Sequence, residues 1–385
     1  MYQFYYIAET QFDLRDAVSN RIVNNIKAIT SKNDCVFTII GYGESKEIIY
    51  DGITIKNVKK GKGLIQKLFY FVFRGFFVSK LLSKELIQPG ILIYYGCSFR
   101  FLFPLRRYAL KKKIKIICDI AEWYNPSHLP AGGKLSPLSL DVSLGLKYSV
   151  PKCDGVIAIS TFLENYFISQ NVKTIRIPVL VDTIKLEKTA FNIESFNEKY
   201  INLIYAGFPG KKDLIWNVIE AVEKLSQEKI NIRLHILGPT LDELGIKSVN
   251  HLVSSIICYG RINQEIVPEY LKQADFSILI RPDQRYAQAG FPTKFVESLN
   301  AGLPVIANLT SDLSYYLKEG YNGFIVKDCS ANSIMEVLKK VVVLNKSKIK
   351  IMKSNSVLTA EENFDYRLFS GRFSKFFNEI LSGVC

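Results

Sequence analysis

Short runs of β-branched and aromatic residues alternate along the whole chain with stretches that carry apolar residues every three or four positions. Nearly continuous apolar runs separated by helical stretches are typical of parallel strands covered by helices on both faces. The pattern occurs twice, so it predicts an α/β protein with two Rossmann-like, doubly wound parallel-sheet domains. The predicted strands are 2–8, 36–40, 91–96, 114–120, 155–160, 201–207, 232–238, 256–260, 276–282, 304–308 and 323–326.

A polar stretch divides the two sets of predicted strands. Residues 183–200 carry charged and polar side chains without a strong period, and a new apolar strand follows at once. Such a stretch is typical of a linker between domains. We therefore expect an N-terminal, acceptor-binding domain over 1–185, a C-terminal domain over 198–360, and a terminal helix over 361–385 that packs towards the N-terminal domain.

Length and composition agree with two folded domains. The chain has 385 residues, and chains of this length usually fold into more than one domain, each with its own hydrophobic core. Its 48% of hydrophobic residues distinguishes it from a disordered protein. Its seven cysteines are scattered and form no C-x-x-C pair, which argues against a disulfide scaffold and a structural zinc site. The first residues do not resemble a secretion signal, so we expect a cytoplasmic protein.

Positive charge is concentrated in the first half of the chain. The formal net charge is +14, and residues 51–150 contain 17 Lys and Arg against five Asp and Glu. Segments 62–84 and 99–115 combine most of this charge with Phe, Leu and Tyr. This composition is typical of helices on an anionic membrane surface. We expect a peripheral protein that contacts the inner face of the cell membrane through these two segments.

Other interpretations of these two segments stay open. Each is also consistent with an ordinary domain helix whose apolar side packs on a sheet. A spanning helix is disfavoured, because a span needs about 20 mainly apolar residues and Lys67 and Arg74 interrupt the run. Nucleic acid is not an expected partner, since no RNA- or DNA-binding pattern accompanies the charge.

Residues 278–308 contain the clearest candidate for binding chemistry. A predicted strand ends at Arg281, a polar loop follows, and Pro292 and Thr293 open a helix that stops at Gly302. Thr293 is the expected N-cap. At the carboxyl edge of a parallel sheet, the free N–H groups and the positive dipole end of a helix suit a phosphate group.

Two charged residues of this helix fit such a ligand. Lys294 lies in the first turn, where a cation is unfavourable for the helix itself and where a bound anion would offset that effect. Glu297 lies one turn further on, where a carboxylate can accept hydrogen bonds from ribose hydroxyls. Taken alone, Glu297 is more typical of a surface residue that complements the helix dipole.

These residues carry a family resemblance. The segment AGFPTKFVESLNAGLPVIANLTSDL (289–313) resembles the donor-binding motif of GT-B fold glycosyltransferases, especially the retaining family 4 group of capsule and O-antigen synthesis. YAGFPGKKD (205–213), HILGPT (235–240) and YGRINQEIVPEYLKQADFSILIRPD (259–283) match the same family in the expected order. Together they cover most of residues 201–330, whereas the first half resembles the family only in its α/β rhythm.

The resemblance implies two domains facing a cleft, a nucleoside diphosphate sugar as donor substrate, no further cofactor, and retention of configuration. It implies that Lys212, or Lys211 in its place, faces the donor diphosphate, that Arg261 and Ile262 border the base, and that Glu297 holds the ribose. The expected donor-binding residues are Gly207, Lys211, Lys212, Arg261, Ile262, Arg281, Gly290, Phe291, Pro292, Thr293, Lys294 and Glu297.

One position departs from the family pattern. The first glutamate of the E-x7-E motif is replaced by Ala289, so the sugar side of the reaction lacks a carboxylate often assigned to it. The nearby polar residues that could compensate are Asp283, Arg285 and Gln288. The chain contains no D-x-D motif, so we expect no metal and assign neutralisation of the diphosphate to Lys212, Lys294 and the helix N-terminus.

The acceptor side is less well defined. Asp119 lies at the end of a predicted first-domain strand, and Glu122 and His128 follow that strand. These three residues and Asp283 are the candidates for direct catalytic function. The fold and the basic, Phe-rich first domain together favour a lipid-linked glycan acceptor in cell-envelope polysaccharide synthesis. The alternatives are a catalytically inactive GT-B scaffold or sugar-nucleotide-binding protein, and a GT-B sugar-nucleotide epimerase.

Overall fold

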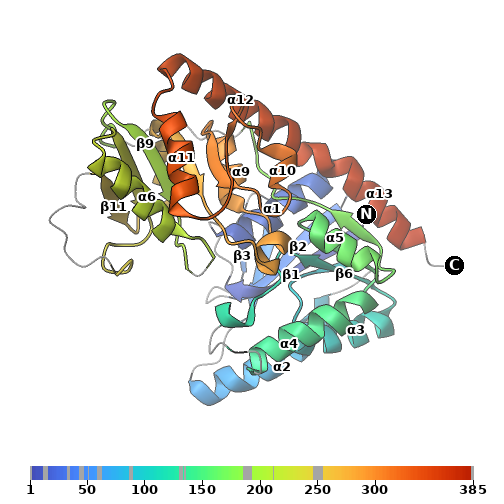
Figure 1. The fold of residues 1–385 in the computed structure, drawn as a ribbon. Coiled ribbons are helices and arrows are strands. Elements are labelled where there is room, and N and C mark those ends of the chain that lie inside the picture. Colours follow the sequence, from blue (N-terminus) through green and yellow to red (C-terminus); the bar gives the residue numbers. More distant parts are fainter. Residues whose placement is uncertain are drawn as a thin grey trace. The chain divides into compact units, whose positions relative to one another are not determined.

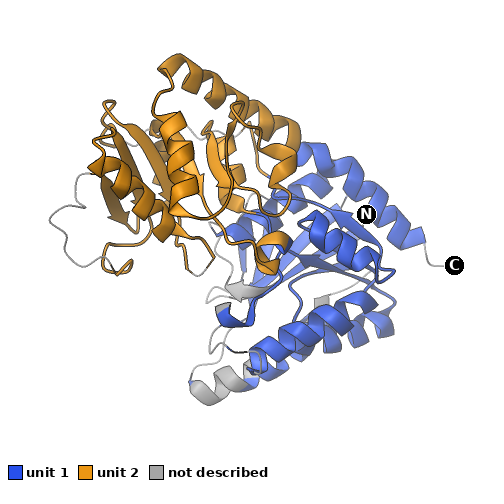
Figure 2. Ribbon diagram, viewed as in Figure 1, with its two compact units in different colours: residues 1–180, 289–291, 366–385 blue, residues 181–288, 292–365 orange. Residues whose placement is uncertain are grey.

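The computed structural model of the chain forms two compact units (Figure 2). Unit 1 comprises residues 1–180, 289–291 and 366–385, and unit 2 comprises residues 181–288 and 292–365. Each unit contains one sheet and its own hydrophobic core. The structure describes residues 2–11, 16–32, 35–42, 47–50, 52–58, 63–85, 90–129, 133, 136–184, 193–210, 212–245 and 255–382.

Unit 1 is built on an eight-stranded sheet in the order β3-β4-β2-β1-β5-β6-β7-β8. Its pairings are parallel except that of the edge strand β3, which forms an antiparallel pair with β4. The central strands are buried on both faces, as their nearly continuous apolar sequences predict. The strands are β1 (Tyr2–Gln11), β2 (Cys35–Tyr42), β3 (Glu47–Tyr50), β4 (Ile53–Val58), β5 (Gly90–Tyr95), β6 (Lys115–Ile120), β7 (Gly155–Ala158) and β8 (Thr174–Arg176).

One face of this sheet is covered by α1 and by the C-terminal helix α13. Phe373, Phe376 and Phe377 of α13 join Ile22 and Ile26 of α1 in the core of unit 1. The C-terminal helix α13 therefore belongs to unit 1, whereas residues 361–365 belong to unit 2. The helices and helical turns of unit 1 are α1 (Ala17–Thr30), α2 (Leu64–Glu85), α3 (Phe99–Lys112), η1 (Pro126–His128), α4 (Pro137–Leu144), η2 (Gly145–Ser149), η3 (Val150–Lys152), α5 (Thr161–Ile168), η5 (Tyr366–Phe369) and α13 (Ser370–Ser382).

The two basic, Phe-rich segments form the helices α2 and α3, which pack against each other (Figure 1). Gly75 lies at their contact, since a Cβ atom there would stand 2.6 Å from Cγ of Pro104. Phe69 and Phe76 of α2 nevertheless stay 55% and 54% exposed. Within the described part of the chain, no helix is long and apolar enough to cross a membrane.

Unit 2 is built on a six-stranded sheet in the order β11-β10-β9-β12-β13-β14, with every pairing parallel. The strands are β9 (Ile201–Ala206), β10 (Ile232–Leu237), β11 (Ile256–Gly260), β12 (Phe276–Leu279), β13 (Val305–Asn308) and β14 (Gly323–Val326). The helices and turns are α6 (Ile215–Gln227), η4 (Gln264–Ile266), α7 (Val267–Gln273), α8 (Arg285–Ala289), α9 (Thr293–Asn300), α10 (Leu313–Tyr316), α11 (Ala331–Val341) and α12 (Lys346–Phe364).

The order of these strands sets the place where a ligand would bind. Strands β10 and β11 lie on one side of β9, and the chain then crosses to the other side to form β12, β13 and β14. In open parallel sheets, ligands bind beyond the carboxyl ends of the strands where the direction of winding changes. In unit 2 this is the region after β9 and β12. The fold class predicted from the sequence, two doubly wound α/β domains, is confirmed.

Candidate functional site

The first strand of unit 2 ends in a glycine that admits a lysine side chain. Gly207 follows β9 with φ of +117°, a conformation that non-glycine residues rarely adopt. A Cβ atom at this position would stand 2.6 Å from Cε of Lys294. Gly207 therefore both turns the chain and leaves room for Lys294, which comes from the first turn of α9.

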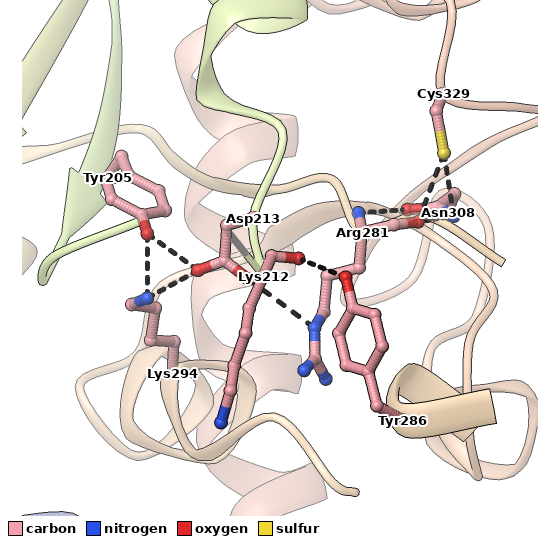
Figure 3. Close-up of polar contacts among 8 residues, drawn as sticks. All are labelled: Tyr205, Lys212, Asp213, Arg281, Tyr286, Lys294, Asn308 and Cys329. Atoms are coloured by element: carbon pink, nitrogen blue, oxygen red, sulfur yellow. Dashed lines mark hydrogen bonds and ion pairs between the residues drawn. The ribbon is translucent and has the colours of Figure 1, made fainter. Parts of the chain in front are cut away.

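Arg281 follows β12, and its backbone is fixed by the neighbouring strand (Figure 3). Oδ1 of Asn308, at the end of β13, accepts a hydrogen bond from the Arg281 N–H at 2.9 Å. Nδ2 of Asn308 donates to the Arg281 carbonyl at 2.7 Å, and the Cys329 thiol donates to the same carbonyl at 3.1 Å. The side chain of Asn308 thus continues the parallel ladder by one residue and holds Arg281 in place.

Lys294 and Arg281 meet at one carboxylate, that of Asp213 (Figure 3). Lys294 Nζ donates to Asp213 Oδ2 at 2.6 Å and to the Tyr205 hydroxyl at 2.8 Å. The Tyr205 hydroxyl donates to the same Oδ2 at 2.6 Å, and Arg281 Nε lies 3.5 Å from Oδ1. The side chains of Asp213 and Arg281 are 8% and 9% exposed, and that of Lys294 is 27% exposed.

The cluster contains two cations and only one carboxylate, so it keeps donor groups for another acceptor. Arg281 Nε and Nη1 are buried without a hydrogen-bond partner among the described residues. A lysine ammonium has three donors, and two of those of Lys294 are used. Buried polar groups in folded proteins are almost always hydrogen-bonded. The arrangement is therefore suited to bind an anion.

Burial shifts two pKa values at this site. The pKa of Tyr205 is raised by burial and then by the adjacent Asp213 carboxylate, so the phenol stays protonated and donates to Asp213. Glu297, one turn after Lys294 on α9, keeps an exposed side-chain surface. Protein nevertheless surrounds it closely enough to raise the pKa of its carboxyl, while the Lys294 cation acts in the opposite direction.

The turn before α9 differs from the sequence-based expectation. Gly290, Phe291 and Pro292 are buried, and the segment 289–291 belongs to unit 1. The Ser160 hydroxyl donates to the Ala289 carbonyl at 2.6 Å. Pro292, not Thr293, is the N-cap of α9, and Thr293 is its first helical residue. Side-chain donors near this turn are therefore supplied by the partly exposed Thr293 and Lys294.

The remaining donor-side candidates occupy different positions. Lys212 lies in the turn after β9, and its side chain extends away from Asp213 (Figure 3). Lys211 lies outside the described residues. Arg261 is exposed and forms an ion pair with Glu243 at 3.1 Å, and Ile262 packs on a small hydrophobic cluster. Asp283 is exposed and accepts a hydrogen bond from Gln288 at 2.6 Å.

Asp119 lies in the interior of unit 1, so we replace its catalytic assignment by a structural one. Its side chain is completely buried and pairs with Arg21, whose Nη2 lies 2.7 Å from Oδ1. The hydroxyl of Tyr6 donates to Oδ2, and Asn25 Nδ2 lies 3.2 Å from the same oxygen. Arg21 Nη1 also donates to the carbonyls of Ile177 and Pro178, so Asp119 joins strands and a helix of one unit.

Two other candidates of the first domain follow β6. Glu122 is partly exposed and belongs to the chain segment that leads to η1. His128 is the last residue of η1. Trp123, which directly follows Glu122, contacts Phe162 and Tyr166 of α5 edge to face. These contacts fix the segment after β6 on α5. Glu122 and His128 remain candidates on the acceptor side.

The sequence analysis missed Asp213, Tyr205 and Asn308. Asp213 directly follows Lys212, and Tyr205 lies in the apolar strand before it. A carboxylate next to lysines at the carboxyl end of a predicted strand was the available signal. Asn308 had a weaker one, a polar residue at the end of the strand after Arg281.

Residues 187–356 match the family model described as glycosyl transferases group 1. This range includes Tyr205, Asp213, Arg281 and Lys294.

Two relatives are similar in sequence. An uncharacterised glycosyltransferase of Methanocaldococcus jannaschii is 25% identical over 317 residues, covering 80% of this chain and 79% of the relative. An uncharacterised 41.2 kDa protein in the cps region of Klebsiella pneumoniae is 24% identical over 273 residues, covering 70% of this chain and 65% of the relative.

Solved structures share the fold over nearly the whole chain. The sucrose-phosphate synthase of Thermosynechococcus elongatus aligns with a TM-score of 0.74 at 12% identity, covering 100% of both chains. HepE of Anabaena, solved in complex with UDP, aligns with a TM-score of 0.65 at 13% identity, covering 98% of this chain and 100% of the other. At these identities the likeness concerns the fold alone.

Proposed function

We propose that this chain transfers a hexose from a nucleoside diphosphate sugar to a glycan acceptor. Residues 187–356 match the family model of group 1 glycosyl transferases, and solved structures share the fold of nearly the whole chain. The proposed reaction retains the anomeric configuration and is independent of metal. We further propose a lipid-linked acceptor and a role in cell-envelope polysaccharide synthesis.

One observation carries the donor side of the proposal. Arg281 and Lys294 share a single carboxylate at the carboxyl ends of β9 and β12, and they retain donors for an anion. A diphosphate group would accept those hydrogen bonds, and charge-assisted bonds of this kind are stronger than neutral ones. HepE of Anabaena was solved with UDP, which makes UDP and its sugars the first ligands to test.

The same cations support leaving-group departure. When the bond between sugar and diphosphate breaks, negative charge develops on the diphosphate oxygen. Fixed donors stabilise that charge without reorganisation of solvent. In this proposal Arg281, Lys294 and Lys212 supply the stabilisation, Glu297 holds the ribose, and Glu122 and His128 are the acceptor-side candidates in place of the buried Asp119.

The acceptor class rests on the helix α2 and on one relative. Phe69, Phe73 and Phe76 are exposed at helical spacing on one side of α2, and Lys80 follows one turn later. An amphipathic surface of this type binds anionic lipids through apolar burial and charge. The Klebsiella pneumoniae relative lies in a cps region. A membrane-bound glycan acceptor is consistent with both observations.

A binding experiment tests the donor side. We expect UDP or GDP to raise the melting temperature of the protein, because a ligand that binds only the folded state stabilises it. Glu297→Ala should weaken binding of the nucleoside diphosphate but not that of inorganic pyrophosphate, which has no ribose. If Glu297→Ala binds the nucleoside diphosphate as tightly as wild-type protein does, Glu297 returns to the role of a surface residue.

A transfer experiment tests the reaction. Nucleotide sugars with a lipid-diphosphate glycan acceptor should give transfer that EDTA does not reduce, with the anomeric configuration of the donor retained in the product. A strict requirement for a divalent ion would contradict the assignment of diphosphate neutralisation to Arg281, Lys294 and Lys212.

A vesicle experiment tests the membrane surface. Phe73→Ser combined with Phe76→Ser and Lys80→Glu should release the protein from vesicles of anionic lipid. The control changes two exposed lysines of unit 2, Lys339→Glu and Lys346→Glu, and should leave binding unchanged. Equal binding of both variants would contradict attachment through α2.

The residue at position 289 is a specific reason to keep the alternative of a catalytically inactive scaffold. Ala289 is completely buried and replaces a glutamate of the resembling family. A catalytically inactive scaffold would bind the nucleotide sugar and membrane but transfer nothing. Nucleotide binding without transfer to any lipid-linked acceptor would favour this alternative over the enzyme.

A further inference from the structure

We infer that Asp213 is a positioning residue that holds Lys294 and Arg281 in place and competes with the diphosphate product for them. This inference rests on the proposed function, because it assumes that these two cations bind the donor diphosphate. It adds a role for a carboxylate at the centre of the cationic site. Asp213 would favour release of the nucleoside diphosphate after transfer.

The two oxygens of Asp213 are used differently. Oδ2 accepts from Lys294 Nζ and from the Tyr205 hydroxyl, both at 2.6 Å. Oδ1 lies 3.5 Å from Arg281 Nε, which is beyond hydrogen-bond length. The carboxylate therefore holds Lys294 directly and Arg281 only through charge, so that the Arg281 N–H groups stay available.

The backbone around Asp213 makes this carboxylate a fixed partner. Its own N–H donates to the Pro209 carbonyl at 3.2 Å, and the N–H of the next residue, Leu214, donates to the Ile280 carbonyl at 2.8 Å. Ile280 directly precedes Arg281. The turn that carries Asp213 is thus tied to the end of the strand that carries one of its two cations.

The charge of the cluster sets how tightly an anion is held. With Asp213 ionised, the two cations and the carboxylate together have a net charge of +1, and an arriving diphosphate shares the cations with the carboxylate. Without that carboxylate the diphosphate would face both charges in a site that is largely shielded from water. Interactions between charges are strong in such surroundings, so removal of the carboxylate charge would slow product release.

The experiment compares wild-type protein with Asp213→Asn, which keeps the size and one acceptor oxygen but removes the charge. Affinity for UDP or GDP and for inorganic pyrophosphate is measured by calorimetry, and turnover is measured with the matching nucleotide sugar. We expect the variant to bind the diphosphates about tenfold more tightly and to have a lower kcat. Glu220→Gln, an exposed carboxylate on α6 paired with Lys224, is the matched control and should change neither value.

The outcomes separate the two proposals. If wild-type protein binds neither the nucleotides nor pyrophosphate, the proposed function fails. If wild-type protein binds and Asp213→Asn has unchanged or weaker affinity, the inference about Asp213 is wrong and the carboxylate is only structural.

A second variant covers the case in which Asp213→Asn does not fold. Asp213→Glu keeps the charge and displaces the carboxylate, so we expect a lower kcat with an affinity no tighter than that of wild type. Tighter binding of the diphosphates by Asp213→Glu would contradict competition by charge.

Discussion

The two units each contain a cluster of an aspartate, a tyrosine hydroxyl and an arginine, but the two clusters differ in how completely they are satisfied. In unit 1, Arg21 uses all three of its nitrogens, on Asp119 and on two backbone carbonyls, and its side chain is 3% exposed. In unit 2, Arg281 lies 3.5 Å from Asp213 and keeps Nε and Nη1 without a hydrogen-bond partner among the described residues.

Charge balance explains this difference. Asp119 faces one cation, whereas Asp213 faces both Arg281 and Lys294. A buried pair with matched charges and complete hydrogen bonds stabilises a particular packing. A site with one cation more than it has carboxylates is suited to a ligand that brings negative charge. Charge balance and unused donors therefore distinguish these clusters better than the residue types do.

The largest effect is expected from breaking the cluster of unit 1. Asp119→Ala should lower the free energy of unfolding by about 3–5 kcal/mol, because it leaves Arg21 buried without a counter-ion. Glu47→Ala removes an exposed partner of Lys56 and should change it by less than about 1 kcal/mol. Chemical denaturation measures both. Normal stability of Asp119→Ala with loss of sugar transfer would restore the catalytic assignment of Asp119.

The buried His235 also has hydrogen-bond partners for both ring nitrogens, and its contribution to stability depends on pH. It is 2% exposed, Nδ1 lies 2.9 Å from the Tyr259 hydroxyl, and Nε2 lies 3.0 Å from Asn202 Oδ1. Burial, and then the Arg233 cation, lower the pKa of His235 to about 4. The unfolded chain therefore binds a proton at higher pH than the folded chain does.

The sign of the pH effect follows from that difference. The contribution of His235 to stability is complete above pH of about 6.5 and is lost as the pH falls to about 4, a total of about 3 kcal/mol. Urea unfolding at a series of pH values should show a steeper loss for the wild type than for His235→Gln. Identical pH profiles would mean that the folded protein accepts the proton on His235 without penalty.

Substitution of Lys294 tests whether the unused hydrogen-bond donors of the unit 2 cluster bind a ligand. Lys294→Met should weaken nucleoside diphosphate binding about 10- to 100-fold, since a hydrogen bond to a charged group contributes about 1.5–3 kcal/mol. Lys224→Met, which removes an exposed lysine of α6, is the control for calorimetry. A variant of Lys294 that loses stability but binds normally would make the lysine a structural partner of Asp213.

The smallest effect is expected from the tyrosine hydroxyls, which occupy equivalent places in the two clusters. Tyr6 lies between Asn25 and Asp119, and Tyr205 lies between Lys294 and Asp213. Tyr205→Phe should destabilise the protein by about 0.5–1.5 kcal/mol. Tyr6→Phe should cost about 1–3 kcal/mol, because its partners are left completely buried. If thermal unfolding shows a larger loss of stability for Tyr205→Phe than for Tyr6→Phe, the unit 2 cluster is not the more solvent-exposed of the two.

The sequence determined the parts of this protein that depend on local pattern. Apolar runs predicted the strands that became β9, β12 and β13, and the Pro292 start and Gly302 stop predicted α9. These features follow from hydrophobic periodicity and from backbone preferences of single residues. The location of Arg281 and Lys294 at the carboxyl edge of the second sheet followed directly from them.

Tertiary structure alone decided which charges meet. Asp213 and Lys294 are 81 residues apart in the chain, and they meet because β9 pairs with β12 across the point where the winding reverses. Asp119 follows the same local pattern as a catalytic aspartate, but Arg21, 98 residues away, makes it structural. The burial and charge pairing of a side chain depend on which strands lie beside it in the fold. The residues next to it in the sequence do not determine those neighbours.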